Sequence, residues 1–228
     1  MTLFIHDNFL LSNDTARHLY HDVAAPLPII DFHCHLSPQM IADDHRFATI
    51  TELWLGGDHY KWRAMRANGI DERYITGDAT DREKFEKWAE TLPYTLRNPL
   101  YHWSHLELAT AFGITDLLGP DTAADIYARC NALLATPAYS ARRFIRRYHV
   151  ETVCTTDDPT DTLEHHQRIA ESGFEVKVLP AWRPDKAMAV ADAAAYNAYL
   201  DRLAEAKHLT RDEALAAIRR QYDGYHFT

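Results

Sequence analysis

The sequence predicts an α/β protein that forms part of a (β/α)8 TIM-type barrel, with a large helical insertion after the first strand. Two apolar segments, 150–155 and 175–179, are separated by one helical segment at about 161–171. Two strands joined by a single crossover helix are almost always parallel. An earlier apolar segment, 28–32, supplies a third strand, and the long stretch between it and residue 150 has helical periodicity.

The elements around the first strand are predicted from capping residues and periodicity. Ser12 caps a helix that ends before Pro26. We expect its apolar stripe to flank the fold; the stripe consists of Ala16, Leu19, Tyr20 and Val23. Residues 28–32 have the composition of a short buried strand, after which Ser37 provides a capping hydroxyl and Pro38 the first residue of the next helix.

The remaining elements are mostly helices. In the stretch before the second strand we expect them at 50–55, 58–68, 81–92, 99–112, 121–134 and 140–148. Gly69 and Gly113 stand where two of these helices should stop. After the third strand, residues 187–206 and 210–220 are also predicted to be helical.

These elements indicate three parts. Residues 1–36 hold the amino-terminal helix and first barrel strand, residues 37–148 an inserted helical subdomain, and residues 149–228 further β/α units of an incomplete barrel. A parallel sheet is covered on both faces, and three strands alone would leave edges exposed. We therefore expect the chain to be the amino-terminal part of a larger barrel, and the exposed edges favour a homo-oligomer.

Composition excludes several classes of function. With 24 Lys and Arg against 33 Asp and Glu, the net charge is −9 and no basic stripe is present to neutralise phosphates, which argues against a nucleic-acid partner. No apolar segment is long enough to span a membrane, and no basic region precedes the first apolar run, so a cytoplasmic protein is expected. Three scattered cysteines favour reduced thiols over a disulfide framework.

A histidine pair marks the end of the first strand. His33 and His35 are two residues apart, so on a strand their side chains point to the same side and can converge on one metal ion, while Cys34 points away. The alternative is a chance His-x-His in a chain with 14 histidines. The position favours a site, because parallel α/β folds bind ligands just beyond the carboxyl ends of their strands.

Polar side chains also follow the other two strands. Asp157 and Asp158 come after the second strand, and Trp182 and Arg183 after the third. The two aspartates could bind substrate hydroxyls or could cap the turn ahead of Pro159. An arginine at a strand end suits a carboxylate ligand, although it could also pair with a nearby acid in its own loop.

A third candidate region is the start of the helix at 58–68. Two glycines and Asp58 place His59 and Tyr60 in its first turn, where unpaired amides and the helix dipole favour an anion. His59 and Tyr60 could donate or relay protons there. Alternatively, Tyr60 is a core residue and His59 is solvated. The other helical histidines, including His166, are interpreted as structural or surface residues.

Four motifs together resemble the uronate isomerase family, also called glucuronate isomerase, of the amidohydrolase superfamily. They are Asp31-Phe32-His33-Cys34-His35-Leu36, Gly57-Asp58-His59-Tyr60-Lys61-Trp62-Arg63-Ala64-Met65, Thr155-Thr156-Asp157-Asp158-Pro159 and Leu179-Pro180-Ala181-Trp182-Arg183-Pro184-Asp185. The resemblance extends to about Ala206 and covers what would be the amino-terminal half of a family member.

The resemblance implies a distorted barrel that interconverts D-glucuronate with D-fructuronate and D-galacturonate with D-tagaturonate. It implies that His33 and His35 bind a divalent metal, most simply zinc, and that His59, Tyr60 and Arg183 face the hexuronate. It further implies an aldose–ketose isomerisation in which a proton moves between C2 and C1 through an enediol-like intermediate. The family's additional aspartate ligand, a candidate general base, has no counterpart in this sequence.

Two other interpretations stay open from the sequence. One is a metal-dependent hydrolase of the same superfamily, in which a metal-bound hydroxide attacks an amide or ester. The other is a non-catalytic remnant that folds as helices on a partial sheet. Because two histidines fall short of the three protein ligands of a catalytic zinc site, we expect a truncated chain of this kind to hold zinc weakly and to have little activity alone.

Overall fold

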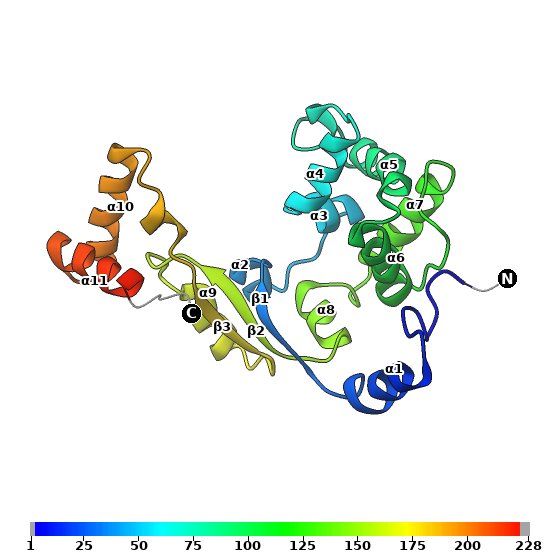
Figure 1. Ribbon diagram of the computed structural model, residues 1–228, viewed down its shortest axis with the longest axis horizontal. Helices are drawn as coiled ribbons and strands as arrows, with labels where there is room; N and C mark the ends of the chain where they lie inside the picture. Colours follow the sequence, from blue (N-terminus) through cyan, green and yellow to red (C-terminus); the bar gives the residue numbers. More distant parts are fainter. Residues whose placement is uncertain (1–2, 224–228) are drawn as a thin grey trace. The chain divides into compact units, whose positions relative to one another are not determined.

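The computed structural model, which describes residues 3–223, contains a three-stranded parallel sheet and is otherwise mainly helical (Figure 1). The chain divides into two compact units. The first comprises residues 3–28 and 44–149, and the second comprises residues 29–43 and 150–223. The sheet belongs to the second unit.

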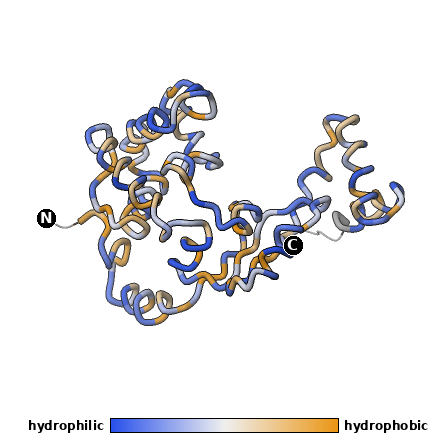
Figure 2. Tube along the Cα trace, turned by 180° about the vertical axis from the view of Figure 1, so that it is seen from behind, coloured by the Kyte–Doolittle hydropathy of each residue, from blue (hydrophilic) through white to orange (hydrophobic). Residues whose placement is uncertain are grey.

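The first unit is built from helices. It begins with α1 (Asp14–His18), which continues into a π-helical segment, Leu19–Ala24. The longer helices that follow are α3 (Ile50–Leu55), α4 (His59–Ala67), α5 (Asp81–Thr91), α6 (Pro99–Phe112), α7 (Ala123–Leu134) and α8 (Ala141–Arg147). Short 3-10 helices occur at Glu72–Tyr74 and Leu92–Thr95. Along these helices the trace alternates between hydrophobic and hydrophilic residues, as expected of amphipathic helices around a core (Figure 2).

The bounds of these helices follow local signals in the sequence. Thr80 and Glu83 form a capping box at the start of α5. Helix α6 begins with the cap Asn98 and with Pro99 at its first position, and ends at Gly113, whose φ of +66° is readily adopted by glycine. The predicted bounds of α3 and α6 are confirmed, and those of the other four helices differ by at most two residues.

The second unit contains the sheet, in the order β1 (Ile29–Cys34), β2 (Val150–Asp157) and β3 (Lys177–Trp182). Both pairs of strands are parallel, as predicted. Helix α9 (Glu164–Glu171) is the crossover between β2 and β3, and the short α2 (Pro38–Ala42) follows β1. Strand β2 extends past its predicted end, and β3 covers 177–182 rather than the predicted 175–179, so that Asp157 and Trp182 are their last residues.

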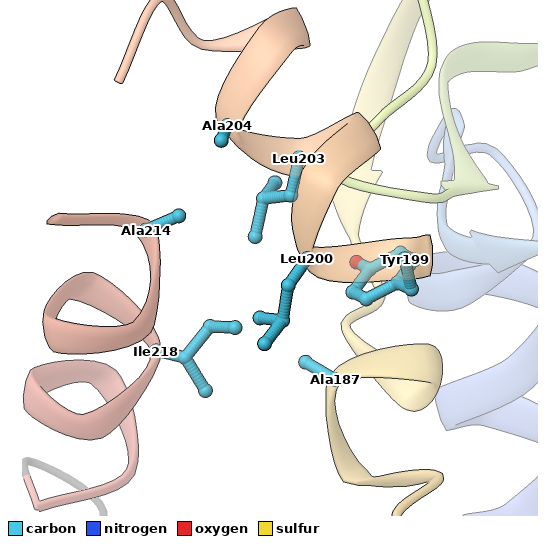
Figure 3. Close-up of a cluster of buried hydrophobic side chains, with 7 residues drawn as sticks. All are labelled: Ala187, Tyr199, Leu200, Leu203, Ala204, Ala214 and Ile218. Carbon is cyan, nitrogen blue, oxygen red and sulfur yellow. The ribbon is translucent and has the colours of Figure 1, made fainter. Parts of the chain in front are cut away.

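A separate apolar cluster is formed after β3. A 3-10 helix, Asp185–Met188, leads into α10 (Ala193–Ala206) and α11 (Arg211–Asp223). Leu200 and Leu203 of α10 face Ile218 of α11, and Ala187 lies beside them (Figure 3). These helices therefore have a core of their own.

The amino-terminal helix differs from its prediction in two respects. Its cap is Asn13 rather than Ser12, because the Asn13 side chain accepts a hydrogen bond from the amide of Ala16. Its apolar stripe is also poorly covered, since Leu19 and Tyr20 are about half exposed. Within residues 3–223, the stripe is therefore not a buried contact.

The prediction that the first strand is buried is wrong for these residues. Ile30 is 63% exposed and Phe32 is 81% exposed. The reason is that β1 is an edge strand, which pairs with β2 on one side, and no layer among the described residues covers these side chains. Ser37 precedes α2 as predicted, with Pro38 at the first position, but its hydroxyl makes no capping hydrogen bond.

Between residues 3 and 223, no helix has both the length and the apolar character needed to cross a membrane.

Candidate functional site

The two histidines at the end of β1 converge, as their spacing predicts. His33 is in the strand and His35 follows it, and their Nε2 atoms are 3.0 Å apart. The ring centroids are 4.8 Å apart and the rings are nearly perpendicular. Both side chains are exposed. Two imidazole nitrogens that approach one point from different directions are suited to sharing one cation.

The neighbouring groups do not complete a metal site. Burial raises the pKa of the Cys34 thiol to about 11, which does not favour a thiolate at this position. The carboxylate of Asp31 accepts a hydrogen bond from the amide of His33 at 3.3 Å. In the part of the chain that the structure describes, no group of three or more His, Cys, Asp or Glu side chains is arranged to hold a metal ion.

His59 and Tyr60 are in the first turn of α4, as predicted, and both are exposed. The imidazole of His59 packs edge-on against Trp62, with 4.7 Å between ring centroids. Tyr60 is 65% exposed, which contradicts the alternative that it is a core residue. The guanidinium of Arg63 lies 5.7 Å from the centre of its ring, a cation–π contact.

Two amides of this first turn are already occupied, so they are not free for an anion. The Oδ1 atom of Asp58 accepts hydrogen bonds from the amides of Tyr60 and Lys61, at 2.9 and 3.0 Å. Its Oδ2 atom is 2.8 Å from the Lys61 ammonium. Partial burial opposes ionisation, but the ammonium and the two amides outweigh it and hold the pKa of Asp58 below its ordinary value.

Lys61 and a second carboxylate lie beneath this turn. The Lys61 side chain is 6% exposed and its ammonium is 5.5 Å from the ring centre of Trp54. Burial raises the pKa of Glu107 on α6, although the charge of Lys61 acts in the opposite direction. The start of α4 thus has a buried charged underside and an exposed side that carries His59 and Tyr60.

Asp157, at the end of β2, is buried rather than open to a ligand. Its side chain is 7% exposed. Its Oδ2 atom accepts hydrogen bonds from the hydroxyl of Thr155 at 2.7 Å and from the amide of Ala181 at 3.1 Å. Its Oδ1 atom is 3.7 Å from Nε2 of His166. The structure therefore brings Asp157 together with a threonine and a histidine.

Asp158 and Arg183 lie in the loops that follow β2 and β3. Asp158 accepts hydrogen bonds from the amide and hydroxyl of Thr160, and its Oδ2 atom is 3.3 Å from the Lys186 ammonium. Partial burial opposes ionisation, but these partners hold the pKa of Asp158 below its ordinary value.

Nε of Arg183 is 2.8 Å from the carboxylate of Asp185, the pairing with a loop acid that the sequence left as an alternative. Trp182 is 51% exposed.

Sequence reasoning missed the partnership of His166. This residue of α9 is 9% exposed, and its Nε2 atom is 2.8 Å from the hydroxyl of Thr155. The available signal was its position three residues before Ile169, which places both side chains on the buried face of α9. A cavity of about 290 Å³ adjoins it, lined by Pro38, Thr156, Asp157, Asp161, Thr162, Leu163, Glu164, His165 and His166.

Comparison with protein families and curated proteins gives one consistent answer. Residues 1–227 match the family model described as glucuronate isomerase. The chain is 62% identical over 227 residues to the uronate isomerase of Phocaeicola vulgatus, covering 98% of this chain and 48% of that protein. It is 54% identical over 228 residues to the uronate isomerase of Cellvibrio japonicus, with the same coverage. The chain thus spans about half the length of the curated relatives it matches.

Solved structures agree with the sequence comparisons. The crystal structure of uronate isomerase from Thermotoga maritima superimposes with a TM-score of 0.87 at 34% identity, covering 97% of this chain and 49% of that one. Glucuronate isomerase from Caulobacter crescentus gives a TM-score of 0.84 at 29% identity, covering 96% and 49%. The predicted resemblance is confirmed: this chain belongs to the uronate isomerase family.

Proposed function

We propose that this chain contributes metal-binding and substrate-binding residues to the aldose–ketose isomerisation of hexuronates, D-glucuronate to D-fructuronate and D-galacturonate to D-tagaturonate. The observation that carries the proposal is the pair of convergent imidazoles at the end of β1, in a chain that belongs to this family. The reaction moves a proton between C2 and C1 through an enediol-like intermediate, so it needs groups that hold the sugar acid and groups that move protons.

His33 and His35 fit a divalent metal such as zinc. Zinc–nitrogen distances are about 2.0–2.1 Å, so two nitrogens 3.0 Å apart can both bind one ion. A bound ion would polarise an oxygen of the substrate as a Lewis acid. Because a catalytic zinc site uses three protein ligands, the pair supplies only part of the set and should hold the ion weakly by itself.

Arg183 is the proposed partner of the substrate carboxylate. Its guanidinium is exposed and pairs through Nε with Asp185, an interaction between two exposed groups that a ligand carboxylate can displace at small cost. Trp182, half exposed beside it, offers an apolar surface to the sugar ring.

Asp158 is proposed to accept hydrogen bonds from substrate hydroxyls. Asp157 is also proposed to serve the substrate site, and its burial favours an indirect role.

His59 and Tyr60 are proposed to take part in proton transfer. Both side chains are exposed on a helix turn whose backbone is held by Asp58. A phenol and an imidazole can both donate a proton to an oxygen and take it back. Their exposure and the rigid backbone support these roles.

We further infer that β1, β2 and β3 are strands of a (β/α)8 barrel into which the helices between β1 and β2 are inserted. Their parallel order and the crossover helix α9 support this inference. The exposure of Ile30 and Phe32 also supports it, since barrel strands bury such side chains under neighbouring layers.

A chimaera tests the proposed function. This chain would replace the matching 227-residue segment of the Phocaeicola vulgatus relative, and turnover of D-glucuronate would be followed by proton NMR in deuterated water. We expect D-fructuronate to form, and a His33→Ala chimaera to lose at least about 99% of the rate, because a catalytic ligand is missing. His21→Ala, which changes a histidine outside the proposed site, is the control.

The same chimaera separates the alternatives. Hydrolysis of an amide or ester panel without conversion of D-glucuronate would favour a hydrolase. Absence of both activities in a folded chimaera would favour a non-catalytic chain and contradict the proposal.

A further inference from the structure

We propose that Thr155, Asp157 and His166 are positioning residues, which hold the end of β3 and thereby set the placement of Trp182 and Arg183. The inference rests on the proposed function in one respect, namely that Trp182 and Arg183 face the hexuronate.

Asp157 of β2 makes two hydrogen bonds to the end of β3. Asp157 pairs with Trp182 at the last position of the parallel ladder. Its carbonyl oxygen accepts a hydrogen bond from the amide of Arg183 at 3.0 Å, and its carboxylate accepts one from the amide of Ala181 at 3.1 Å. The backbone on both sides of Trp182 is therefore held by Asp157, once through the main chain and once through the side chain.

The carboxylate of Asp157 is itself held in place by a buried hydroxyl. Thr155 is completely buried, and its Oγ1 atom donates to Oδ2 of Asp157 at 2.7 Å. The Oδ2 atom thus accepts two hydrogen bonds, and the side chain is 7% exposed. Direct contact between this oxygen and a sugar hydroxyl would require one of the two protein donors to be displaced. This arrangement favours positioning over direct binding.

His166 completes the chain of hydrogen bonds from α9. The Thr155 hydroxyl lies 2.7 Å from Oδ2 of Asp157 and 3.3 Å from the carbonyl oxygen of Leu179. Because the carboxylate is the nearer acceptor and is charged, the single hydroxyl proton is assigned to it, and Thr155 then accepts a proton from Nε2 of His166 at 2.8 Å. The histidine therefore carries its proton on Nε2. Its Nδ1 atom is buried and has no hydrogen-bond partner among residues 3–223, so the bond to Thr155 is what anchors the ring.

Loss of the Thr155 hydroxyl should therefore move the end of β3. Without it, the carboxylate of Asp157 keeps only one neutral donor in a buried environment, which is unfavourable for an ion. The carboxylate would reorient toward His166, 3.7 Å away, and release the amide of Ala181. The side chain next to that amide, Trp182, would report the change.

The test compares Thr155→Val with Thr155→Ser in the 228-residue chain labelled with 5-fluorotryptophan. The 19F resonance of Trp182 is assigned with Trp182→Phe, and the affinity for D-glucuronate is measured in the chimaera that carries each substitution. We expect Thr155→Val to shift and broaden the Trp182 resonance and to weaken binding about tenfold, the effect of one lost hydrogen bond to a charged group. Thr155→Ser, which retains the hydroxyl, should restore the Trp182 resonance and the affinity for D-glucuronate.

Thr51→Val is the matched control. Thr51 is also a buried threonine whose hydroxyl donates a hydrogen bond, to the carbonyl of Asp81 at 2.6 Å, but it belongs to the other unit. The Thr51→Val substitution should lower stability about as much as Thr155→Val does, and it should leave the Trp182 resonance unchanged. If Thr155→Val does not fold, His166→Gln and His166→Leu make the same comparison, because glutamine can still donate to Thr155 and leucine cannot.

The outcomes separate the two proposals. An unshifted Trp182 resonance in folded Thr155→Val, or in folded His166→Leu, would overturn the positioning role. A shifted Trp182 resonance together with a folded chimaera that does not convert D-glucuronate would retain the positioning role and count against the proposed function.

Discussion

The histidines show how neighbours set the chemistry of a residue. His33 and His35 converge on one point, and His59 is exposed at a helix start. His105 and His166 are buried, and each has its proton placed by hydrogen bonds. The spacing of His33 and His35 could be read from the sequence because it is local. The partner of His166 is 11 residues away on another element, so no local pattern reveals it.

His105 should make the stability of its surroundings depend on pH. Its Nδ1 atom donates to the carbonyl of Tyr101, and its Nε2 atom accepts from the amide of Leu118 at 3.0 Å. Burial lowers the pKa of His105 below 6.5, although the bond to Tyr101 acts in the opposite direction. The unfolded chain therefore binds the proton first as the pH falls, and stability is lost below about pH 6.5.

Hydrogen exchange measures this effect at one amide. The protection factor of the Leu118 amide should fall as the pH is lowered from 7 to 5, whereas that of Ile114, which donates to the carbonyl of Leu108, should change less. In His105→Gln the difference between the two amides should no longer depend on pH. Equal pH dependence of the two amides in the unsubstituted chain would contradict the assigned role.

At the scale of elements, the helix ends are where sequence and structure agree best. Capping residues act over three or four positions. Gly113 marks a predicted helix end that the structure confirms, and Thr80 and Asn98 cap two helices whose predicted starts are confirmed. The start of α4 was also predicted. The Asp58 carboxylate accepts hydrogen bonds from two amides of its first turn, which are then not free for an anion.

Asp58 should contribute more to stability than a helix cap alone. Asp192 caps α10 in the same way, accepting from two amides at 3.0 Å, but it has no buried lysine beside it. We expect Asp192→Ala to cost about 1 kcal/mol of unfolding free energy. Asp58→Ala should cost about 3 kcal/mol, because it also leaves the ammonium of Lys61 buried without its partner.

Urea denaturation of both variants and of Asp58→Asn makes the comparison. Asparagine retains a capping oxygen, so Asp58→Asn isolates the loss of the charge pair. Its cost in unfolding free energy should fall between the costs of Asp192→Ala and Asp58→Ala. Equal costs for Asp58→Ala and Asp192→Ala would show that the pair with Lys61 adds nothing.

For the whole molecule, the sheet decides which apolar residues are buried. Residues 28–32 have the composition of a buried strand, yet β1 is at the edge of the sheet and Phe32 is 81% exposed. Composition shows that a strand is suited to burial. Whether another layer covers it depends on elements far away in the sequence.

Phe32 should respond differently in this chain and in the chimaera. In the 228-residue chain we expect Phe32→Ser to change the unfolding free energy by less than about 0.5 kcal/mol, whereas Phe85→Ala, at a completely buried position, should cost about 4 kcal/mol. In the chimaera, a barrel would bury Phe32, and Phe32→Ser should cost at least about 2 kcal/mol. Thermal melts of both proteins measure this, and an equally small effect in both would count against the barrel.

The sequence by itself determined the order and type of the elements, the parallel strands, the His33 and His35 pair and the family resemblance. The helix bounds, the pairing of β2 with β3 and the spacing of the histidines depend on neighbours within a few residues or on one crossover connection. The resemblance rests on four motifs between residues 31 and 185. Only the tertiary structure decided that Asp157 is buried with Thr155 and His166, and that β1 is exposed. Burial and buried hydrogen bonds are formed between elements that are distant in sequence, so local periodicity contains no record of them.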